Sequence, residues 1–181
     1  MHEVIIALGS NLGSRIQFLL DAEAKLVQLP KTTDFKFSSI YQSAPIGCAE
    51  SPDYLNAVVS CKTELDPYKL LELLQQIENA HHRTRSYPNA PRTLDLDIIF
   101  YDNKISSDPI LTLPHPRMHE RFFVLTPLCE INPNLIHPLL KKTIAELEIL
   151  LHDKEKLIML SKEQFVSNKG IDNDRTKNKN T

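Results

Sequence analysis

The chain has 181 residues, of which 41% are hydrophobic and 24% are charged, with a formal net charge of −2 and a pI near 6.4. This balance predicts a globular protein with enough length for one sizeable core. The near-neutral charge excludes a general attraction to nucleic acid or to an anionic membrane, so a phosphate ligand needs a local cluster of cations.

The first half of the chain alternates between strand and helix patterns. The apolar run Val4–Leu8 predicts a strand that ends in a loop with two glycines. Apolar residues at helical spacing follow over 16–27, and a capping box of Ser14 and Gln17 predicts where this helix begins. Two further strands are expected over 35–41 and 54–61, which are rich in aromatic and β-branched residues.

A second helix and a third strand pattern complete a recognisable order. Asp66 followed by Pro67 is a favoured helix start, and an apolar stripe runs on to Ile77. The segment 92–101 then returns to a strand pattern. The order β-α-β-β-α-β predicts an α+β, ferredoxin-like core, in which an antiparallel sheet carries two helices on one face. Additional C-terminal strands and helices are expected over 102–151.

The domain organisation follows from composition. Residues 1–160 are expected to form a single domain. Residues 161–181 are rich in Lys, Asn and Asp, so they bury too little apolar surface to offset their ordering entropy, and a disordered tail is predicted.

Asp95 and Asp97 place two like charges inside an apolar strand pattern. Side chains in a strand alternate at about 3.3 Å per residue, so both carboxylates share one face roughly 6.6 Å apart. Aspartate is depleted in strands, and two close carboxylates favour a cation between them. Oxygen ligands are those that Mg²⁺ prefers. The pattern therefore favours a magnesium site over two merely solvating charges.

Three arginines, Arg83, Arg85 and Arg92, fall close to this acidic pair in the predicted topology. Taken alone, each is explained by a helix C-terminus or by ordinary solvation. Guanidinium groups also bind phosphate oxygens bidentately and stabilise the charge that develops in phosphoryl transfer. The acidic pair and the arginines together indicate a site for a metal and a nucleotide.

Other motifs are less specific. The loop Gly9–Gly13 matches neither the dinucleotide fingerprint nor the Walker loop, so a tight turn explains it equally well. Tyr54 and Asn56 share one strand face and suit a flat heterocycle, with a buried, satisfied Asn as the rival explanation. His115 and His119 are four residues apart, but no third zinc ligand is evident.

In combination, these segments resemble the 6-hydroxymethyl-7,8-dihydropterin pyrophosphokinase family over residues 3–160. The segment 91–99 (PRTLDLDII) resembles the family signature, and the segments 9–11, 45–47, 52–56 and 114–115 follow in the expected order. The resemblance implies transfer of the terminal diphosphate of ATP to the pterin hydroxymethyl group in folate biosynthesis, with release of AMP. It also implies two Mg²⁺ ions.

The resemblance implies roles for named residues. Asp95 and Asp97 bridge both metal ions, and Arg83 and Arg92 join them as catalytic residues. The implied ATP-binding positions are Gln75, Glu78, Arg83, Arg85, Arg92, Ile98, Thr112, His115 and Arg121. The implied pterin-binding positions are Ser43, Ala44, Ile46, Tyr54, Asn56 and Phe123.

One loop departs from the family's pattern. The chain reads Ser86-Tyr87-Pro88-Asn89 where many relatives carry a basic residue and a large aromatic, and it contains no tryptophan. Tyr87 is therefore the candidate for stacking on the pterin in this loop.

Cellular location and partners follow from simpler features. Cys48, Cys61 and Cys129 fit no metal-finger pattern, as is typical of reduced cytosolic thiols. The first apolar run is too short for a signal peptide or a membrane span. We expect a cytoplasmic monomer with small-molecule substrates and no nucleic-acid or membrane partner.

Two alternatives remain open from the sequence. A Mg²⁺-dependent nucleotidyl transferase also carries a Gly-Ser loop and a paired-aspartate strand, but it releases pyrophosphate instead of AMP. A non-catalytic ferredoxin-like module binds a nucleotide without needing Mg²⁺.

Overall fold

The computed structural model describes residues 1–45, 52–81, 93–151 and 157–160. Its helices and strands are β1 (His2–Ser10), α1 (Arg15–Leu26), β2 (Thr32–Phe37), β3 (Tyr41–Ser43), β4 (Tyr54–Thr63), α2 (Pro67–Ala80), β5 (Asp95–Tyr101), β6 (Ser106–Ser107), β7 (Thr112–Leu113), the 3₁₀ helix η1 (Met118–Glu120), α3 (Phe122–Ile131), α4 (Ile144–Leu150) and β8 (Ile158–Met159). The expected tail, 161–181, lies outside the described residues.

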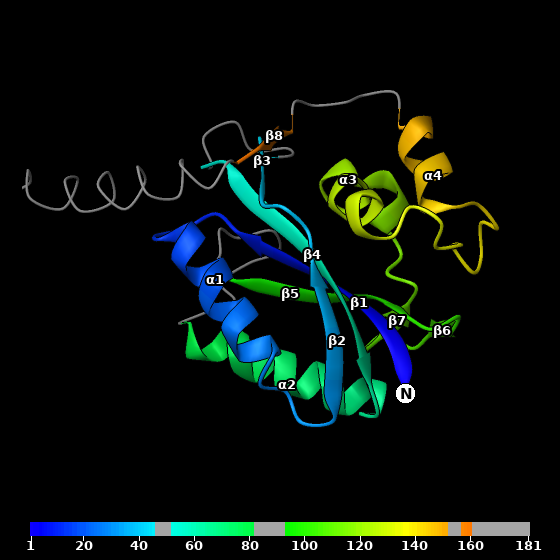
Figure 1. Ribbon diagram of the computed structural model, residues 1–181, viewed down its shortest axis with the longest axis horizontal. Coiled ribbons are helices and arrows are strands. Elements are labelled where there is room, and N and C mark those ends of the chain that lie inside the picture. Colours follow the sequence, from blue (N-terminus) through cyan, green and yellow to red (C-terminus); the bar gives the residue numbers. More distant parts are fainter. Residues whose placement is uncertain (46–51, 82–92, 152–156, 161–181) are drawn as a thin grey trace, which may run out of the picture.

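An antiparallel sheet runs through the centre of the molecule (Figure 1). Its strand order is β5-β1-β4-β3-β8, and β2 pairs with the second half of β4 beside β3. A separate two-stranded sheet joins β6 to β7. Because β1 lies between β4 and β5, residues from these three strands meet side by side near the end of β1.

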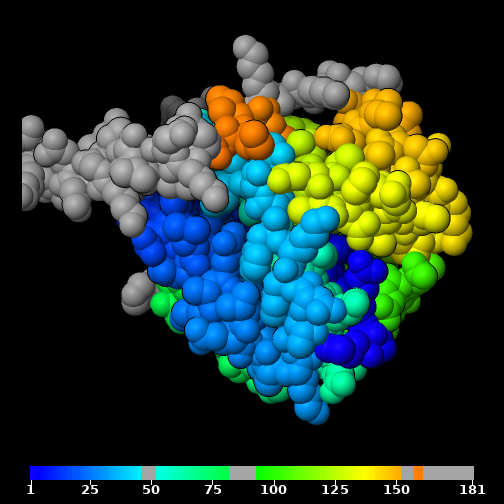
Figure 2. All heavy atoms as spheres, in the orientation of Figure 1, coloured from blue at the N-terminus to red at the C-terminus, as the bar shows by residue number. Residues whose placement is uncertain are grey.

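Helices cover both faces of the sheet. α1 and α2 pack on one face through Leu19, Leu26, Leu70 and Leu74, and α3 and α4 pack on the other face (Figure 1). In the space-filling view, α1 and the α3–α4 region lie on separate sides of β2 (Figure 2). The ferredoxin-like core with additional C-terminal elements is therefore confirmed, and α3 and α4 supply a third layer.

The central strand β1 contributes side chains to the cores on both faces of the sheet, because its side chains alternate in direction. Val4, Ile6 and Leu8 belong to the core under α1 and α2, whereas Ile5 belongs to the core under α3 and α4. Near the end of β1, Gly9 pairs with the polar residues Asn56 and Asp95, which are part of the candidate site below.

Three local expectations were tested by the structure. Asp66 caps α2 as predicted, since its carboxylate accepts a hydrogen bond from the Tyr68 N–H at 2.9 Å. The Ser14–Gln17 capping box is wrong: Ser14 makes no side-chain capping bond, and the Gln17 amide donates to Asp21 at 2.9 Å. The strand expected over 35–41 is two strands, β2 and β3.

The interruption between β2 and β3 centres on Ser38. Its backbone N–H donates to the Val58 carbonyl at 2.9 Å, and its hydroxyl accepts from the Val58 N–H at 2.9 Å. The Ser38 hydroxyl thus replaces a backbone carbonyl as the acceptor for the Val58 N–H in the sheet. Among the described residues, no helix is both long and apolar enough to cross a membrane.

Candidate active site

Gly9 lies at the centre of the candidate site. It pairs with Asn56 of β4 on one side and with Asp95 of β5 on the other. A methyl group at its Cα would lie 3.8 Å from the Asn56 Oδ1 and 3.9 Å from the Asp95 Cβ. A residue expected to bind pterin and a residue expected to bind metal therefore flank the same glycine.

The two aspartates share one face of β5. Both are half-buried, while Leu94, Leu96 and Ile98 point into the core under α1 and α2. Asp97 pairs with Ala7, two residues before Gly9 in β1, so small residues lie beside both carboxylates. The side chains of β5 alternate between the two faces of the sheet, as expected. Both carboxylates therefore lie on the face away from α1 and α2.

Glu78 of α2 fixes the strand that carries these carboxylates. Its side chain is only 2% exposed, and its Oε1 accepts a hydrogen bond from the Leu96 N–H at 2.7 Å. Leu96 stands between the two aspartates, so the bond ties the helix to the centre of the pair. The predicted contact of Glu78 with ATP stays a prediction.

His115 lies near Asp95 of the acidic pair, and Arg121 lies near His115. The His115 N–H donates to the Ile99 carbonyl of β5 at 3.0 Å, and the Nδ1 accepts from the Arg117 N–H at 3.3 Å. Burial, with the positive charges of Arg121 and Arg117, lowers the pKa of His115 to about 4, and the Asp95 carboxylate opposes this shift. The imidazole is therefore neutral near pH 7, and its Nε2 carries the proton that it can donate.

Ser43, Tyr54 and Asn56 form a second side of the site, here called the β3–β4 wall. Ser43 pairs with Tyr54 across the two strands, and the Asn56 amide donates to the Ser43 hydroxyl at 2.9 Å. Ser43 and Asn56 are 3% and 5% exposed. Such a buried, hydrogen-bonded pair holds the Asn56 amide in one orientation beside Gly9.

Phe123 is the second residue of α3 and lies next to Arg121. The Arg121 guanidinium carbon is 5.6 Å from the centre of the Phe123 ring, within range of a cation–π contact. Arg121 and Phe123 therefore form one unit, although the first was predicted to bind ATP and the second to bind pterin.

The remaining predicted residues are placed less decisively. The Ile98 side chain is 3% exposed in the core under α1 and α2, so only its backbone can contact a ligand. Gln75 and Ala44 are exposed, and Thr112 is half-buried with its hydroxyl donated to the Asp108 carbonyl at 3.0 Å. The other predicted positions, Ile46, Arg83, Arg85 and Arg92, lie outside the described residues, as does Tyr87.

Sequence reasoning missed a chain of hydrogen bonds behind the site. The Ser10 hydroxyl donates to the Thr93 carbonyl at 2.6 Å, and the Thr93 hydroxyl donates to the His81 carbonyl at 2.6 Å. These bonds link the end of β1, the start of β5 and the end of α2. Neither hydroxyl stands out by periodicity, because the residues that they join are far apart in the chain.

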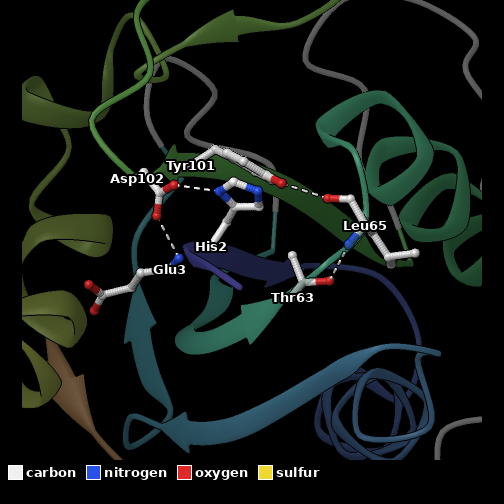
Figure 3. Close-up of polar contacts among 6 residues, drawn as sticks. All are labelled: His2, Glu3, Thr63, Leu65, Tyr101 and Asp102. Atoms are coloured by element: carbon white, nitrogen blue, oxygen red, sulfur yellow. Dashed lines mark hydrogen bonds and ion pairs between the residues drawn. The ribbon is translucent and has the colours of Figure 1, made fainter.

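A hollow of about 590 Å³ lies at the opposite end of the sheet and is not the candidate site. Its lining includes His2, Leu65, Tyr101 and Asp102. These residues are joined to their neighbours: Asp102 accepts from the Glu3 N–H at 2.7 Å and contacts the His2 Nδ1 at 2.6 Å, and the Tyr101 hydroxyl donates to the Leu65 carbonyl at 2.6 Å (Figure 3). The Asp102 contacts secure the start of β1 to the end of β5, and the Tyr101 bond joins β5 to the segment between β4 and α2.

Comparison with known proteins decides the family. The family described as 7,8-dihydro-6-hydroxymethylpterin-pyrophosphokinase (HPPK) matches residues 5–133. The chain belongs to this family. The HPPK match spans β1 to α3 and so includes the Gly9 neighbourhood, the acidic pair and Phe123.

Curated relatives agree with this assignment. The 2-amino-4-hydroxy-6-hydroxymethyldihydropteridine pyrophosphokinase of Bacillus subtilis is 49% identical over 70% of this chain and 75% of its own length. The Haemophilus influenzae enzyme of the same name is 47% identical over 76% of this chain and 86% of its own. This HPPK chain is accordingly an enzyme, and it catalyses ATP-dependent pyrophosphoryl transfer to hydroxymethyldihydropterin in folate biosynthesis.

Solved structures support the fold. The wild-type HPPK-DHPS of Plasmodium falciparum with pteroate superposes with a TM-score of 0.64 at 15% identity, over 82% of this chain and 42% of that chain. At such low identity the likeness establishes the architecture alone. It agrees with the ferredoxin-like core of the HPPK chain.

Proposed function

We propose that the chain performs the pyrophosphokinase reaction with Asp95 and Asp97 holding two Mg²⁺ ions against the phosphates of ATP. The single observation that supports this most directly is the position of Gly9, with Asn56 on one side and Asp95 on the other. ATP, the diphosphate donor, and the pterin, the acceptor, can then lie side by side on one face of the sheet. The chain acts, in this proposal, as a cytoplasmic monomer.

The residues present fit magnesium. The acidic pair offers carboxylate oxygens on one face, and among the described residues no group of three or more His, Cys, Asp and Glu side chains completes an all-protein metal cage. Mg²⁺ commonly takes one or two carboxylates and fills its other positions with water and phosphate oxygens. When bound, the ions neutralise phosphate charge and lower the pKa of the attacking hydroxyl.

The part of the site that binds ATP, the diphosphate donor, needs groups that stabilise the negative charge of the leaving AMP. Arg121 supplies a permanent positive charge, and we propose that Arg83, Arg85 and Arg92 supply others. The neutral His115 supplies an N–H donor from Nε2 rather than a charge. Preorganised donors and cations of this kind provide most of the catalysis in phosphoryl transfer.

The part of the site that binds the pterin, which accepts the diphosphate, needs a narrow pocket for a flat ring and side chains that can hydrogen-bond to its edge. The proposed pocket has Asn56 for paired hydrogen bonds and Tyr54 or Phe123 for stacking, with Ser43, Ala44 and Ile46 around them. The Ser43 hydroxyl already receives one N–H of Asn56, so the amide keeps its orientation without a ligand. Positioning the hydroxymethyl oxygen in line with the β-phosphorus is then a matter of binding geometry, since the described part of the chain offers no evident side-chain general base.

Incubation of the protein with ATP, Mg²⁺ and 6-hydroxymethyl-7,8-dihydropterin, followed by product analysis, tests the proposal. AMP and the pterin diphosphate are expected. Asp95→Asn and Asp97→Asn should each lower kcat by about 10³-fold, because each removes a charged ligand from the reacting phosphates.

A matched control is Asp34→Asn in β2, beside the end of β4 that is far from the site. Asp34 pairs with Lys62 at 3.0 Å on the surface, so its change should cost less than about 1 kcal/mol of stability and leave activity intact. Release of pyrophosphate instead of AMP would identify a nucleotidyl transferase. ATP binding that is indifferent to Mg²⁺, without turnover, would identify a non-catalytic module.

A further inference from the structure

Asp53 accepts hydrogen bonds from two different elements. The Arg15 guanidinium of α1 donates to the Asp53 backbone carbonyl at 2.6 Å. The Gln42 amide of β3 donates to the Asp53 carboxylate at 2.7 Å. All three residues are half-buried, so solvent competes only in part for these bonds. One residue thereby connects α1, β3 and the start of β4.

The position of Asp53 explains why side-chain bonds are needed there. β4 begins at Tyr54, and its pairing with β3 ends at the Ser43–Tyr54 pair. Asp53 thus lies one residue beyond the ladder, where the backbone lacks the regular partners of a sheet. Arg15 and Gln42 supply partners in their place, and they restrain the end of β4 from two directions.

The restrained end of β4 carries the β3–β4 wall. Tyr54 follows Asp53 directly, and Asn56 lies two residues further along with its amide bound to Ser43. Gln42 precedes Ser43, so its bond to Asp53 also joins the two strands next to the Ser43–Tyr54 pair. A shift of Asp53 would therefore move Tyr54 and Ser43 relative to Gly9.

We propose that Asp53 is a positioning residue for the pterin, held by Arg15 and Gln42, an inference that rests on the proposed function of the β3–β4 wall. None of the three touches the reacting groups in this proposal. They set where Tyr54 and Asn56 stand, and they link that position to the first turn of α1, which follows the glycine-bearing loop. Their effect is thus specific to the acceptor side of the site.

Steady-state kinetics of full-length Arg15→Ala and Gln42→Ala variants test the inference. The KM for the pterin should rise about 10-fold in each, the effect expected from losing one hydrogen bond that orders a binding surface. The kcat should stay within about 2-fold of wild type, and the KM for ATP should not change. Gln17→Ala is the matched control, because Gln17 lies on the same helix and its amide donates to Asp21.

A double-mutant cycle distinguishes positioning from general loss of structure. Gln42→Ala and Asp53→Ala should be non-additive in the pterin KM, whereas Asp53→Asn, which keeps an acceptor oxygen, should restore a near wild-type value. Equal changes in both KM values and in kcat, together with a lower melting temperature, would overturn the inference.

The inference and the proposed function fail in different ways. An active wild type whose Arg15→Ala and Gln42→Ala variants keep the wild-type pterin KM overturns the inference alone. A wild type that releases no AMP overturns the proposed function, and the inference falls with it.

Discussion

His115 illustrates how much of a residue's chemistry depends on its surroundings. The resemblance to the family implies only that His115 contacts ATP, and the sequence does not indicate its charge. In the structure its backbone N–H is bound to Ile99, and burial with Arg121 and Arg117 lowers its pKa from 6.5 to about 4. The side chain is consequently an uncharged donor at physiological pH rather than a phosphate-binding cation.

The stability of the protein should therefore depend on pH through His115. Its pKa is lower in the folded state, so the unfolded state binds more protons between pH 4 and 6.5. Stability from this residue is fully present above about pH 6.5 and falls as the pH drops toward 4, by at most about 1.4 kcal/mol per pH unit. The free energy of unfolding of His115→Asn, measured in urea at pH 5 and 7.5, should change less than that of wild type. Equal changes in the two proteins would contradict the assignment.

The site was only partly predictable at the level of single residues. Asp95 and Asp97 stand out because charges are rare in an apolar strand, and a two-residue period is enough to place them on one face. Arg15 and Asp53 could not be predicted, since a hydrogen bond between residues 38 positions apart leaves no periodic signal. Such contacts depend on how α1 and β4 pack, which only the assembled fold determines.

The buried Glu78 carboxylate is a polar link between α2 and β5 near the site. A carboxylate that is 2% exposed is costly to bury unless it is hydrogen-bonded, and the Leu96 N–H supplies such a bond. The helix therefore fixes the segment between the two aspartates more firmly than sheet pairing alone.

Glu78→Leu should destabilise the protein by about 1–3 kcal/mol, because it leaves the buried Leu96 N–H without its acceptor. Glu78→Gln keeps an acceptor oxygen, so its free energy of unfolding should fall less than that of Glu78→Leu. Glu72→Leu serves as the control on the exposed side of the same helix, where Glu72 pairs with Lys69 and accepts from the Gln76 amide at the surface. Urea unfolding measures all three, and equal stabilities of the two leucine variants would refute the role of Glu78.

Element boundaries were predictable where local chemistry decides them. Asp66 and Pro67 begin α2 as expected because both act within one helical turn. The Ser14 capping box fails because Ser14 adopts a backbone conformation with φ −76° and ψ 65° and makes no side-chain capping bond. The break at Ser38 is likewise invisible in the apolar pattern, since it depends on pairing with Val58.

The whole molecule is organised as two cores that share one sheet. Leu70 lies in the core under α1 and α2, and Leu125 lies in the core under α3 and α4. β1 contributes side chains to both, so loss of either core removes support from the same central strand. The two cores should consequently unfold together.

Leu70→Ala and Leu125→Ala should each lower the free energy of unfolding by about 2–5 kcal/mol while a single transition is retained. The chain has no tryptophan, so far-UV and tyrosine near-UV circular dichroism are suitable probes. Coincident transitions are expected in both variants. A separate early transition in Leu125→Ala would mean that α3 and α4 unfold independently.

The pairing of Gly9 with both neighbours has a geometric consequence for the reaction. Adjacent strands lie about 4.8 Å apart, so Asn56 and Asp95 are separated by two strand spacings, or roughly 9.6 Å, across the sheet. Backbone hydrogen bonds, rather than flexible side chains, determine this gap. Substitutions in the surrounding loops can therefore alter substrate affinity or the reaction rate. They should leave the distance between Asn56 and Asp95, and so between the two bound substrates, unchanged.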